Sequence, residues 1–107
     1  MSNVATRFAP SPTGALHIGG VRTALFNWLF SKNKKGKFYL RIEDTDKERS
    51  KDEHKVQIIK SLKWIGIEHD GEEYIQSTKI DDHIKVANEL LKSGNAYKCY
   101  CSSEEIE

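Results

Sequence analysis

The sequence has few cysteines, few prolines, no long apolar run and no excess of one charge. Its 107 residues contain two cysteines and two prolines, and 17 Lys and Arg balance 16 Asp and Glu to give a net charge of +1. Two cysteines one residue apart exclude a disulfide scaffold, and the balanced charge excludes a nucleic-acid binder that works by net charge alone. No apolar run approaches the roughly 20 residues of a spanning helix, and no basic stretch followed by an apolar block opens the chain. We therefore expect no membrane segment and a cytoplasmic protein.

The first half of the sequence has the pattern of a strand, a helix and a second strand. Residues 4–9 are rich in β-branched and aromatic side chains and stop at Pro10. Residues 37–43 alternate between apolar and polar side chains, as a strand with one buried face does. Between them an apolar stripe at helical spacing predicts a helix from Val21 to about Lys32 whose apolar side faces the core. The stripe consists of Val21, Ala24, Leu25, Trp28 and Leu29. This order predicts a parallel βαβ unit with a right-handed crossover, and Gly36 supplies the exit turn of the helix.

Two further helices and a short strand are predicted in the second half. Apolar positions from Val56 to Ile65 predict a helix that ends at Gly66, residues 68–73 read as an acidic loop, and a third helix stops at Gly94. The third helix uses Ile80, Ile84, Ala87 and Leu91. Residues 96–100 are predicted as a strand. Overall we predict an α/β fold with parallel strands, with residues 1–107 as one unit.

The last residues predict that the chain continues. Ser102 and Glu105 have the spacing of a capping box, which marks the first turn of a helix. Only two residues follow Glu105, so a helix begins that the chain has no room to complete. We therefore expect this chain to be the amino-terminal piece of a longer protein.

The loop over residues 9–20 is the most promising place for chemistry. It holds both prolines and three of the seven glycines, and it joins a strand to the start of a helix. In an open parallel sheet, ligands bind at the carboxyl ends of the strands, and free amides at a helix start favour phosphate. His17 could donate a hydrogen bond to a phosphoryl oxygen, and Gly19 and Gly20 would let a ligand lie against bare backbone. The alternative is that Pro and Gly are ordinary turn material here, since the loop is neither a P-loop nor a dinucleotide fingerprint.

Several blocks together resemble the bacterial glutamyl-tRNA synthetases, class I aminoacyl-tRNA synthetases with the so-called HIGH motif. The blocks are RFAPSPTG at residues 7–14, LHIGG at 16–20, RTALFNW at 22–28, RIEDTD at 41–46, LKW at 62–64 and AYKCYC at 96–101. They occur in the order of that family and cover nearly the whole chain. This makes the resemblance far more specific than any single motif.

The resemblance implies a fold, an activity and a set of site residues. The fold is α/β, the first half of a Rossmann-like, HIGH-motif nucleotide-binding domain with parallel strands. The activity is ATP-dependent ligation of glutamate to tRNA(Glu) through a glutamyl-adenylate, with Mg²⁺ accompanying ATP, in a parent protein expected to be a monomer. A guanidinium can hold a carboxylate in a fork, and a carboxylate can receive an ammonium group. The implied residues are Arg7, Ser11 and Glu43 for glutamate, His17, Gly19 and Gly20 for ATP, and His17 for catalysis.

The chain also departs from the family pattern. Gly20 stands at the fourth place of the HIGH motif, which removes one donor, and Lys79 stands where the family usually has arginine. Lysine keeps the charge but loses the planar fork. The second nucleotide-binding half, with its KMSKS loop, and the anticodon-binding domain are absent from these residues, so we predict negligible aminoacylation by residues 1–107 alone.

Cys99 and Cys101 resemble the first half of a zinc site found in some members of that family. On a strand, side chains two residues apart share a face, but zinc usually takes four ligands. The zinc site is therefore incomplete within this chain and is expected, if anywhere, in the full-length protein. Two free thiols without a metal are the alternative.

Two other charged groups have plainer readings. The carboxylates of Asp44 and Asp46 could hold a metal for phosphoryl transfer, but we expect Asp44 or Thr45 to form a turn after the strand, with the acidic residues near a helix start. The lysines between residues 32 and 37 could touch tRNA phosphate, but a short lysine run is more often a solvated loop.

Two other functions remain open at this stage. A glutamyl-queuosine tRNA synthetase-like paralogue would share the loop, the glutamate pocket and the cysteines, yet would modify a tRNA base. A non-catalytic tRNA-binding fragment is the other alternative, and it would show a steep salt dependence of binding.

Overall fold

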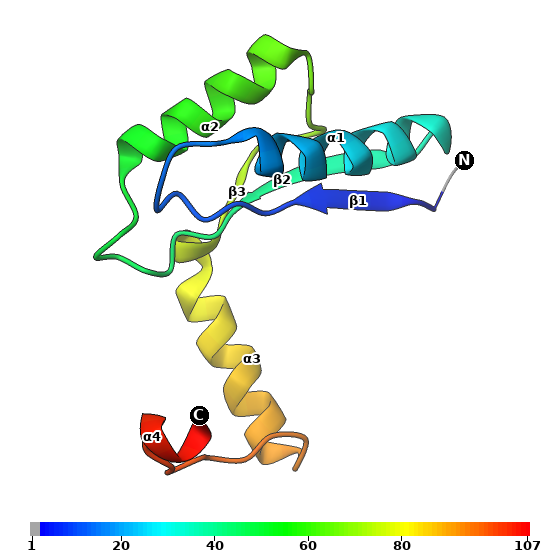
Figure 1. Ribbon diagram of the computed structural model, residues 1–107. Coiled ribbons are helices and arrows are strands. Elements are labelled where there is room, and N and C mark those ends of the chain that lie inside the picture. The colour runs from blue at the N-terminus through cyan, green and yellow to red at the C-terminus, as the bar shows by residue number, and fades with distance from the viewer. Residues whose placement is uncertain (1–2) are drawn as a thin grey trace.

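The computed structural model describes residues 3–107, which form an open α/β fold (Figure 1). Strands β1 (Ala5–Phe8), β2 (Lys37–Ile42) and β3 (Tyr74–Ile75) are parallel and lie in the order β1-β2-β3. Helix α1 (Ile18–Asn33) connects β1 to β2, and α2 (Asp52–Ile65) connects β2 to β3. The predicted α/β class and the parallel βαβ unit are therefore confirmed.

One face of the sheet is closed by the two helices, and the other is open. The alternation predicted for β2 is confirmed, because Phe38, Leu40 and Ile42 are fully buried and Tyr39 between them is exposed. Buried residues of both helices join these strand residues in one core, so α1 and α2 cover the same face. The core contains Phe8, Ala24, Phe38, Leu40, Ile42, Ile58, Leu62 and Ile67. Arg7 of β1 and Tyr39 and Arg41 of β2 alternate with these buried residues and are left on the open face.

Helix α1 buries less than its apolar stripe predicted. It begins at Ile18, three residues before the predicted start, and buries only Ala24 and Ser31 completely. Leu25 and Leu29 are 36% and 47% exposed, so their assignment to the core is wrong. A sheet of a few short strands can bury only a narrow stripe of the helix that packs on it. The Ser31 hydroxyl fits this stripe because it donates to the Trp28 carbonyl at 2.8 Å.

The turn from α1 into β2 differs in mechanism from the prediction. The residue in the left-handed region is Lys35, at a φ of 53°, rather than Gly36. Gly36 is needed for a different reason: a Cβ added there would lie 2.3 Å from the Val4 carbonyl oxygen. The glycine therefore allows α1 to return closely against β1.

Helix α2 ends as predicted, since Gly66 caps it in the left-handed region at a φ of 86°. Ile58 and Leu62 are its buried residues, whereas Val56 is 45% exposed. The predicted acidic loop follows, and Asp70 within it binds the start of β2, accepting from the Phe38 amide at 2.9 Å. This amide hydrogen bond holds the pKa of Asp70 below its ordinary value despite burial, and Lys37 acts in the same direction.

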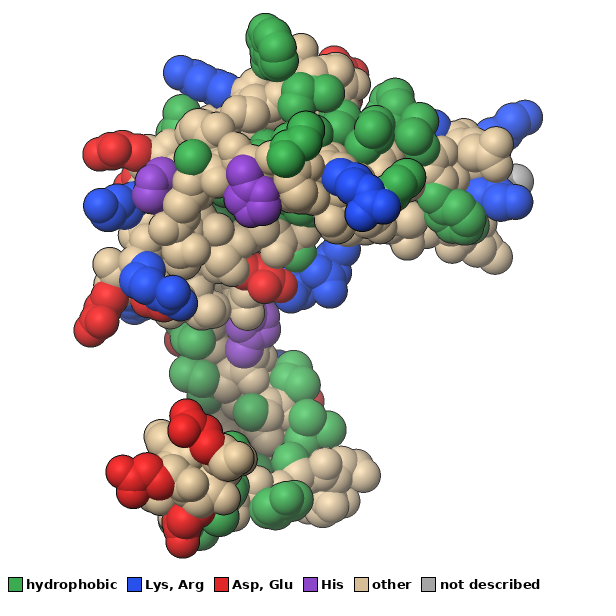
Figure 2. Space-filling view, in the orientation of Figure 1, with side chains coloured by type: hydrophobic (Ala, Val, Ile, Leu, Met, Phe, Trp, Pro, Cys, Tyr) green, Lys and Arg blue, Asp and Glu red, His purple; other side chains and the backbone are tan. Residues whose placement is uncertain are grey.

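Beyond β3, which the sequence did not predict, the chain leaves the sheet. A 3₁₀ turn, η1 (Gln76–Lys79), leads into α3 (Ile80–Lys92), which projects away from the sheet (Figure 1). No residue of α3 is buried, although the helix is amphipathic as predicted. Apolar side chains gather on this projecting part (Figure 2), among them Ile80 and Ile84, each about half exposed. Gly94 follows the helix at a φ of 76°.

The predicted strand over residues 96–100 is wrong. These residues form an irregular segment, with Tyr97 and Tyr100 more than 85% exposed. A strand is stable only beside a partner strand, and this segment lies beyond α3, away from the sheet (Figure 1). The predicted capping box is confirmed: Ser102 and Glu105 exchange both hydrogen bonds at the start of α4 (Ser103–Ile106). None of the helices within residues 3–107 is long and apolar enough to cross a membrane.

Candidate active site

The loop that leads from β1 to α1 lies at the carboxyl ends of both long strands. The amide of Glu43, directly after β2, donates to the Pro10 carbonyl at 2.9 Å. The loop is thus fastened to the end of the neighbouring strand. This is the edge of a parallel sheet where ligands bind in open α/β folds.

His17 caps α1 with both its backbone and its ring. Its carbonyl accepts from the Val21 amide at 3.0 Å, and its Nδ1 accepts from the Gly19 amide at 3.1 Å. A neutral ring that accepts at Nδ1 carries its proton on Nε2. The exposed ring therefore offers an Nε2–H donor at the start of a 16-residue helix. The contact of His17 with a phosphoryl oxygen stays a prediction, and its Nε2–H is a suitable donor for that contact.

The two glycines after His17 make room for side chains of this chain. A Cβ on Gly19 would lie 3.0 Å from the His17 ring, and one on Gly20 would lie 2.9 Å from Leu16 Cδ1. Gly19 therefore lets the imidazole fold back over its amide, and Gly20 lets Leu16 pack against the helix. The contact of a ligand with bare backbone at Gly19 and Gly20 remains a prediction. The packing of His17 and Leu16 is a second reason for glycine at these positions, one that the sequence did not indicate.

Arg7 and Glu43 meet on the open face of the sheet. Arg7 Nη1 lies 3.8 Å from Glu43 Oε1, and Arg41 Nη2 donates to the same oxygen. The Arg41 Nε is buried and has no hydrogen-bond partner. The arginines line a hollow of about 500 Å³ formed by Ala5, Thr6, Arg7, Tyr39, Leu40, Arg41, Glu72 and Tyr74. Two guanidinium groups around one carboxylate suit a small ligand that carries both charges.

The sequence analysis did not assign a role to Arg41. Arg41 and Glu43 are two residues apart at the end of one strand, so the period of two places them on the same face. That spacing was visible in the sequence.

Ser11, the third predicted glutamate ligand, lies elsewhere in the loop. It lines a hollow of about 220 Å³ together with His17, Gly20 and the α2 residue Ile58. The structure thus places Arg7 and Glu43 in direct contact, and groups Ser11 with the predicted ATP residues. Its role toward glutamate stays a prediction.

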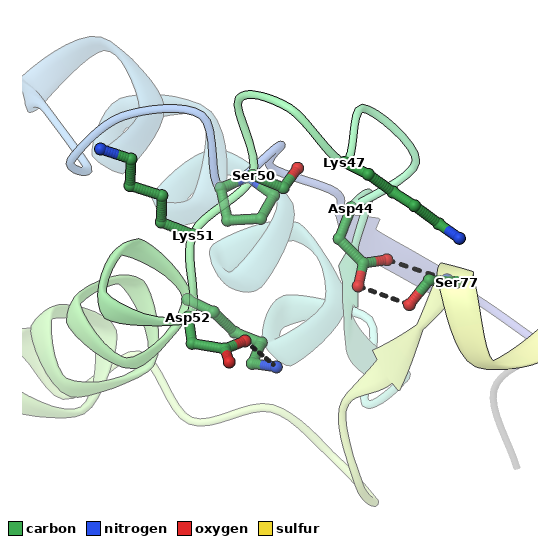
Figure 3. A pocket seen from close by; sticks show the side chains of 8 residues that line it. Asp44, Lys47, Ser50, Lys51, Asp52 and Ser77 are labelled. Atoms are coloured by element: carbon green, nitrogen blue, oxygen red, sulfur yellow. Dashed lines mark hydrogen bonds and ion pairs between the residues drawn. The ribbon is translucent and has the colours of Figure 1, made fainter.

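Asp44 tethers the end of β2 to η1. Its carboxylate accepts from the Ser77 amide at 2.8 Å and from the Ser77 hydroxyl at 2.6 Å (Figure 3). Burial opposes ionisation of Asp44, but the two bonds from Ser77 and the charge of Lys55 hold its pKa below the ordinary value. Of the two expected turn formers, Asp44 and Thr45, the Asp44 carboxylate bonds instead to a residue 33 positions away.

Asp46 makes local hydrogen bonds, accepting in a turn from the Arg49 amide at 3.2 Å and from its guanidinium Nε at 2.6 Å. Beside this turn a hollow of about 170 Å³ is lined in part by Lys47 and Lys51. Their side chains point to opposite sides (Figure 3), so they do not converge on a common ligand.

Lys79 is exposed, as are the lysines that precede or begin β2. Lys79 ends η1 and directly precedes α3, two residues beyond the tethered Ser77. Among the lysines before β2, Lys37 pairs with Asp70 at 3.5 Å. The lysines between residues 32 and 37 are exposed, as the expected solvated loop requires.

Cys99 and Cys101 are both exposed free thiols on the irregular segment, so the expected common face of a strand is wrong. Hydrogen bonds from Cys101, from its backbone first and then its side chain, lower the pKa of the Cys99 thiol. Within residues 3–107 no group of three or more His, Cys, Asp or Glu side chains is placed to hold a metal ion. Zinc usually takes four ligands, so a zinc site that uses Cys99 and Cys101 in the full-length protein stays a prediction.

A parallel sheet, a crossover helix over one face and a loop at the carboxyl end of the first strand define a Rossmann-like α/β fold. The chain belongs to the class I tRNA synthetase family (E and Q): the model of that catalytic domain matches residues 3–107. The family assignment made from the sequence blocks is therefore confirmed.

Relatives with known names are similar over almost all of this chain. The glutamate–tRNA ligase of Pelagibacter ubique (strain HTCC1062) is 87% identical over 107 residues, and glutamate–tRNA ligase 2 of Anaplasma phagocytophilum (strain HZ) is 57% identical over 103. A crystal structure of a glutamate tRNA ligase from Elizabethkingia meningosepticum, in complex with its amino acid, is 43% identical with a TM-score of 0.84. The match covers 96% of this chain and 22% of the Elizabethkingia chain.

The chain spans less than a quarter of these relatives. It corresponds to 23% of the Pelagibacter protein and 22% of the Anaplasma protein. More than three quarters of the length of these relatives therefore lies outside the match.

Proposed function

We propose that this chain supplies the glutamate- and ATP-binding part of a glutamate–tRNA ligase. In its full length, such a protein joins glutamate to tRNA(Glu) through a glutamyl-adenylate, and works in the cytoplasm as a monomer. The observation that supports this most is the contact between Arg7 and Glu43 at the carboxyl end of the sheet, next to the His17 loop. The similarity to glutamate–tRNA ligases over the whole chain agrees with it.

In this proposal each residue has a role that fits its surroundings. The Arg7 guanidinium holds a carboxylate of glutamate, and Glu43, which contacts both arginines, receives the α-ammonium group. The His17 Nε2–H donates to a phosphate oxygen of ATP, whose Mg²⁺ arrives with the nucleotide as substrate. The α-carboxylate of glutamate then attacks the α-phosphate and pyrophosphate leaves; a ribose hydroxyl of the terminal adenosine of tRNA next attacks the acyl carbon of the adenylate, so that the glutamyl ester forms and AMP leaves. Positioning and charge stabilisation carry such a reaction.

The test is glutamate charging by a full-length ligase that carries this segment. Wild-type protein with ATP, Mg²⁺, radiolabelled glutamate and tRNA(Glu) should yield acid-precipitable label. Arg7→Gln should lower kcat/KM for glutamate by roughly 100-fold, because it removes a charged partner from a desolvated carboxylate. The exposed Arg22→Gln, whose guanidinium stacks on Phe26, is a matched control and should leave charging unchanged. Wild-type protein that does not charge any tRNA with glutamate would refute the proposal.

The queuosine-modifying alternative shares the features described above and is separated by the product. A tRNA that lacks its terminal adenosine cannot be charged at the 3′ end, but its bases remain available. Label on this truncated tRNA would favour the alternative, whereas no label supports ligation at the 3′ end. A non-catalytic tRNA-binding role would instead show tRNA binding with no ATP-dependent labelling of either substrate.

A further inference from the structure

Helix α2 holds the His17 loop at more than one point. The Leu16 amide donates to Gln57 Oε1 at 2.8 Å, although the two residues are 41 positions apart. The Pro12 carbonyl accepts from the Lys51 amide at 3.1 Å and contacts His54 Nδ1 at 3.2 Å. The loop is therefore held against the N-terminal half of α2 at both Pro12 and Leu16.

The Gln57 amide has a single consistent orientation. Its Nε2 donates to the Ser61 hydroxyl oxygen at 2.9 Å, one helical turn further along α2. Because a backbone N–H can only donate, the carbonyl end of the Gln57 amide must face Leu16. Gln57 and Leu16 are both half-buried, so water competes only in part for this bond.

The bond acts on the peptide directly before His17. The Leu16 side chain occupies the space that a Cβ on Gly20 would need. Leu16 is therefore packed against the first turn of α1. The next residue on α2, Ile58, lines the same hollow as His17. A shift of the Leu16 amide would therefore move the imidazole and the start of α1 relative to that hollow.

We propose that Gln57 is a positioning residue for the nucleotide half of the site. It accepts the Leu16 N–H and so holds His17 where its Nε2–H can meet phosphate. This inference rests on the proposed function, because it assigns ATP to the loop. Arg7 and Glu43 lie on the open face of the sheet, outside the loop hollow, so Gln57 should affect ATP and not glutamate.

The test compares variants of a full-length ligase that carries this segment. Gln57→Met keeps the length of the side chain and removes the acceptor, while Gln57→Glu keeps an acceptor oxygen. Ser61→Ala is the matched control, because it removes the partner of Nε2 and leaves the bond to Leu16 in place. Each protein is measured for KM of ATP, KM of glutamate, kcat, and hydrogen exchange of the peptide that contains Leu16.

Gln57→Met should raise the KM for ATP about tenfold, the usual effect of leaving a buried donor without its partner. The KM for glutamate should stay within twofold of wild type, and exchange at Leu16 should accelerate. Gln57→Glu should stay within about threefold of wild type, since a charged acceptor still meets the amide. Ser61→Ala should behave as wild type.

Several results would overturn the inference. Equal rises in both KM values would indicate general destabilisation, and unchanged kinetics with unchanged exchange at Leu16 would show that the bond positions nothing. If Gln57→Met does not fold, Gln57→Ser replaces it, because it is too short to reach Leu16 and adds no apolar surface. If wild-type protein does not charge tRNA, the proposed function fails, and Leu16 exchange alone then decides whether Gln57 holds the loop.

Discussion

Gly36 should be the glycine whose replacement most disturbs the site's framework. An alanine Cβ there would lie 2.3 Å from the Val4 carbonyl oxygen and 3.0 Å from Val4 Cβ. Backbone atoms cannot move aside as a flexible side chain can, so β1 and the start of β2 must separate. The bond from the Lys37 amide to the Val4 carbonyl, 3.0 Å long, is the first to loosen.

The magnitude follows from two effects. Overpacking of this kind costs about 1–3 kcal/mol, and a weakened backbone hydrogen bond adds about 1 kcal/mol. The sum of about 2–4 kcal/mol corresponds to roughly a 30- to 700-fold rise in local opening, at tenfold per 1.4 kcal/mol. Hydrogen exchange of the peptides that cover β1 and β2, in a full-length ligase that carries Gly36→Ala, measures this opening directly.

Gly14→Ala is the matched control for Gly36→Ala. No heavy atom lies within 4 Å of the position that its Cβ would take, so we expect wild-type exchange in the strands. If Gly36→Ala and Gly14→Ala exchange alike, the close approach of the turn to β1 does not constrain the fold, and the reasoning is refuted.

Three further predictions concern charged groups. Arg41→Gln removes one of the two cations that contact Glu43. Charging kinetics should therefore show a rise of about tenfold in the KM for glutamate and an unchanged KM for ATP. An unchanged KM for glutamate would contradict this prediction. The lowered pKa of Asp44 means that its contribution to stability is complete above the unfolded value near 3.9 and is lost as the pH falls through the folded value. Unfolding of the Asp44→Asn variant should therefore depend less on pH below 4, and parallel pH profiles for variant and wild type would argue against it. Cys101→Ala should slow alkylation of Cys99 by iodoacetamide near neutral pH, because a hydrogen bond that favours the thiolate is lost, and equal rates by mass spectrometry would count against that bond.

Local patterns in the sequence predicted the parts of the fold that local chemistry determines. The alternation over residues 37–43 places Phe38 and Leu40 inside, the left-handed cap at Gly66 ends α2, and the capping box begins at Ser102. Each depends on residues that are neighbours along the chain. The blocks that identify the family also lie within short windows.

Contacts between distant segments could not be predicted in this way. The bonds from Leu16 to Gln57 and from Ser77 to Asp44 join residues 41 and 33 positions apart, and no periodicity signals them. The helix patterns failed in a related manner, because periodicity shows that a helix has an apolar side but not whether a neighbour covers it. Leu29 of α1 is half exposed for that reason.

The open surfaces bear on whether this segment acts alone. The sheet face that carries Arg7 and Arg41 has no helix of residues 3–107 packed on it, and no residue of α3 is buried. Electrostatic stabilisation of a reacting phosphate depends on donors held in a site that excludes water. The hollow beside Arg7 is wide and open to solvent on the uncovered face, and the chain corresponds to only 23% of the Pelagibacter ligase. We therefore expect residues 1–107, produced alone, to charge tRNA no faster than a blank, with circular dichroism used to establish that α1, α2 and α3 have formed. Charging by the folded segment at a rate comparable to that of a full-length ligase would show that Arg7, Glu43 and His17 need no further cover.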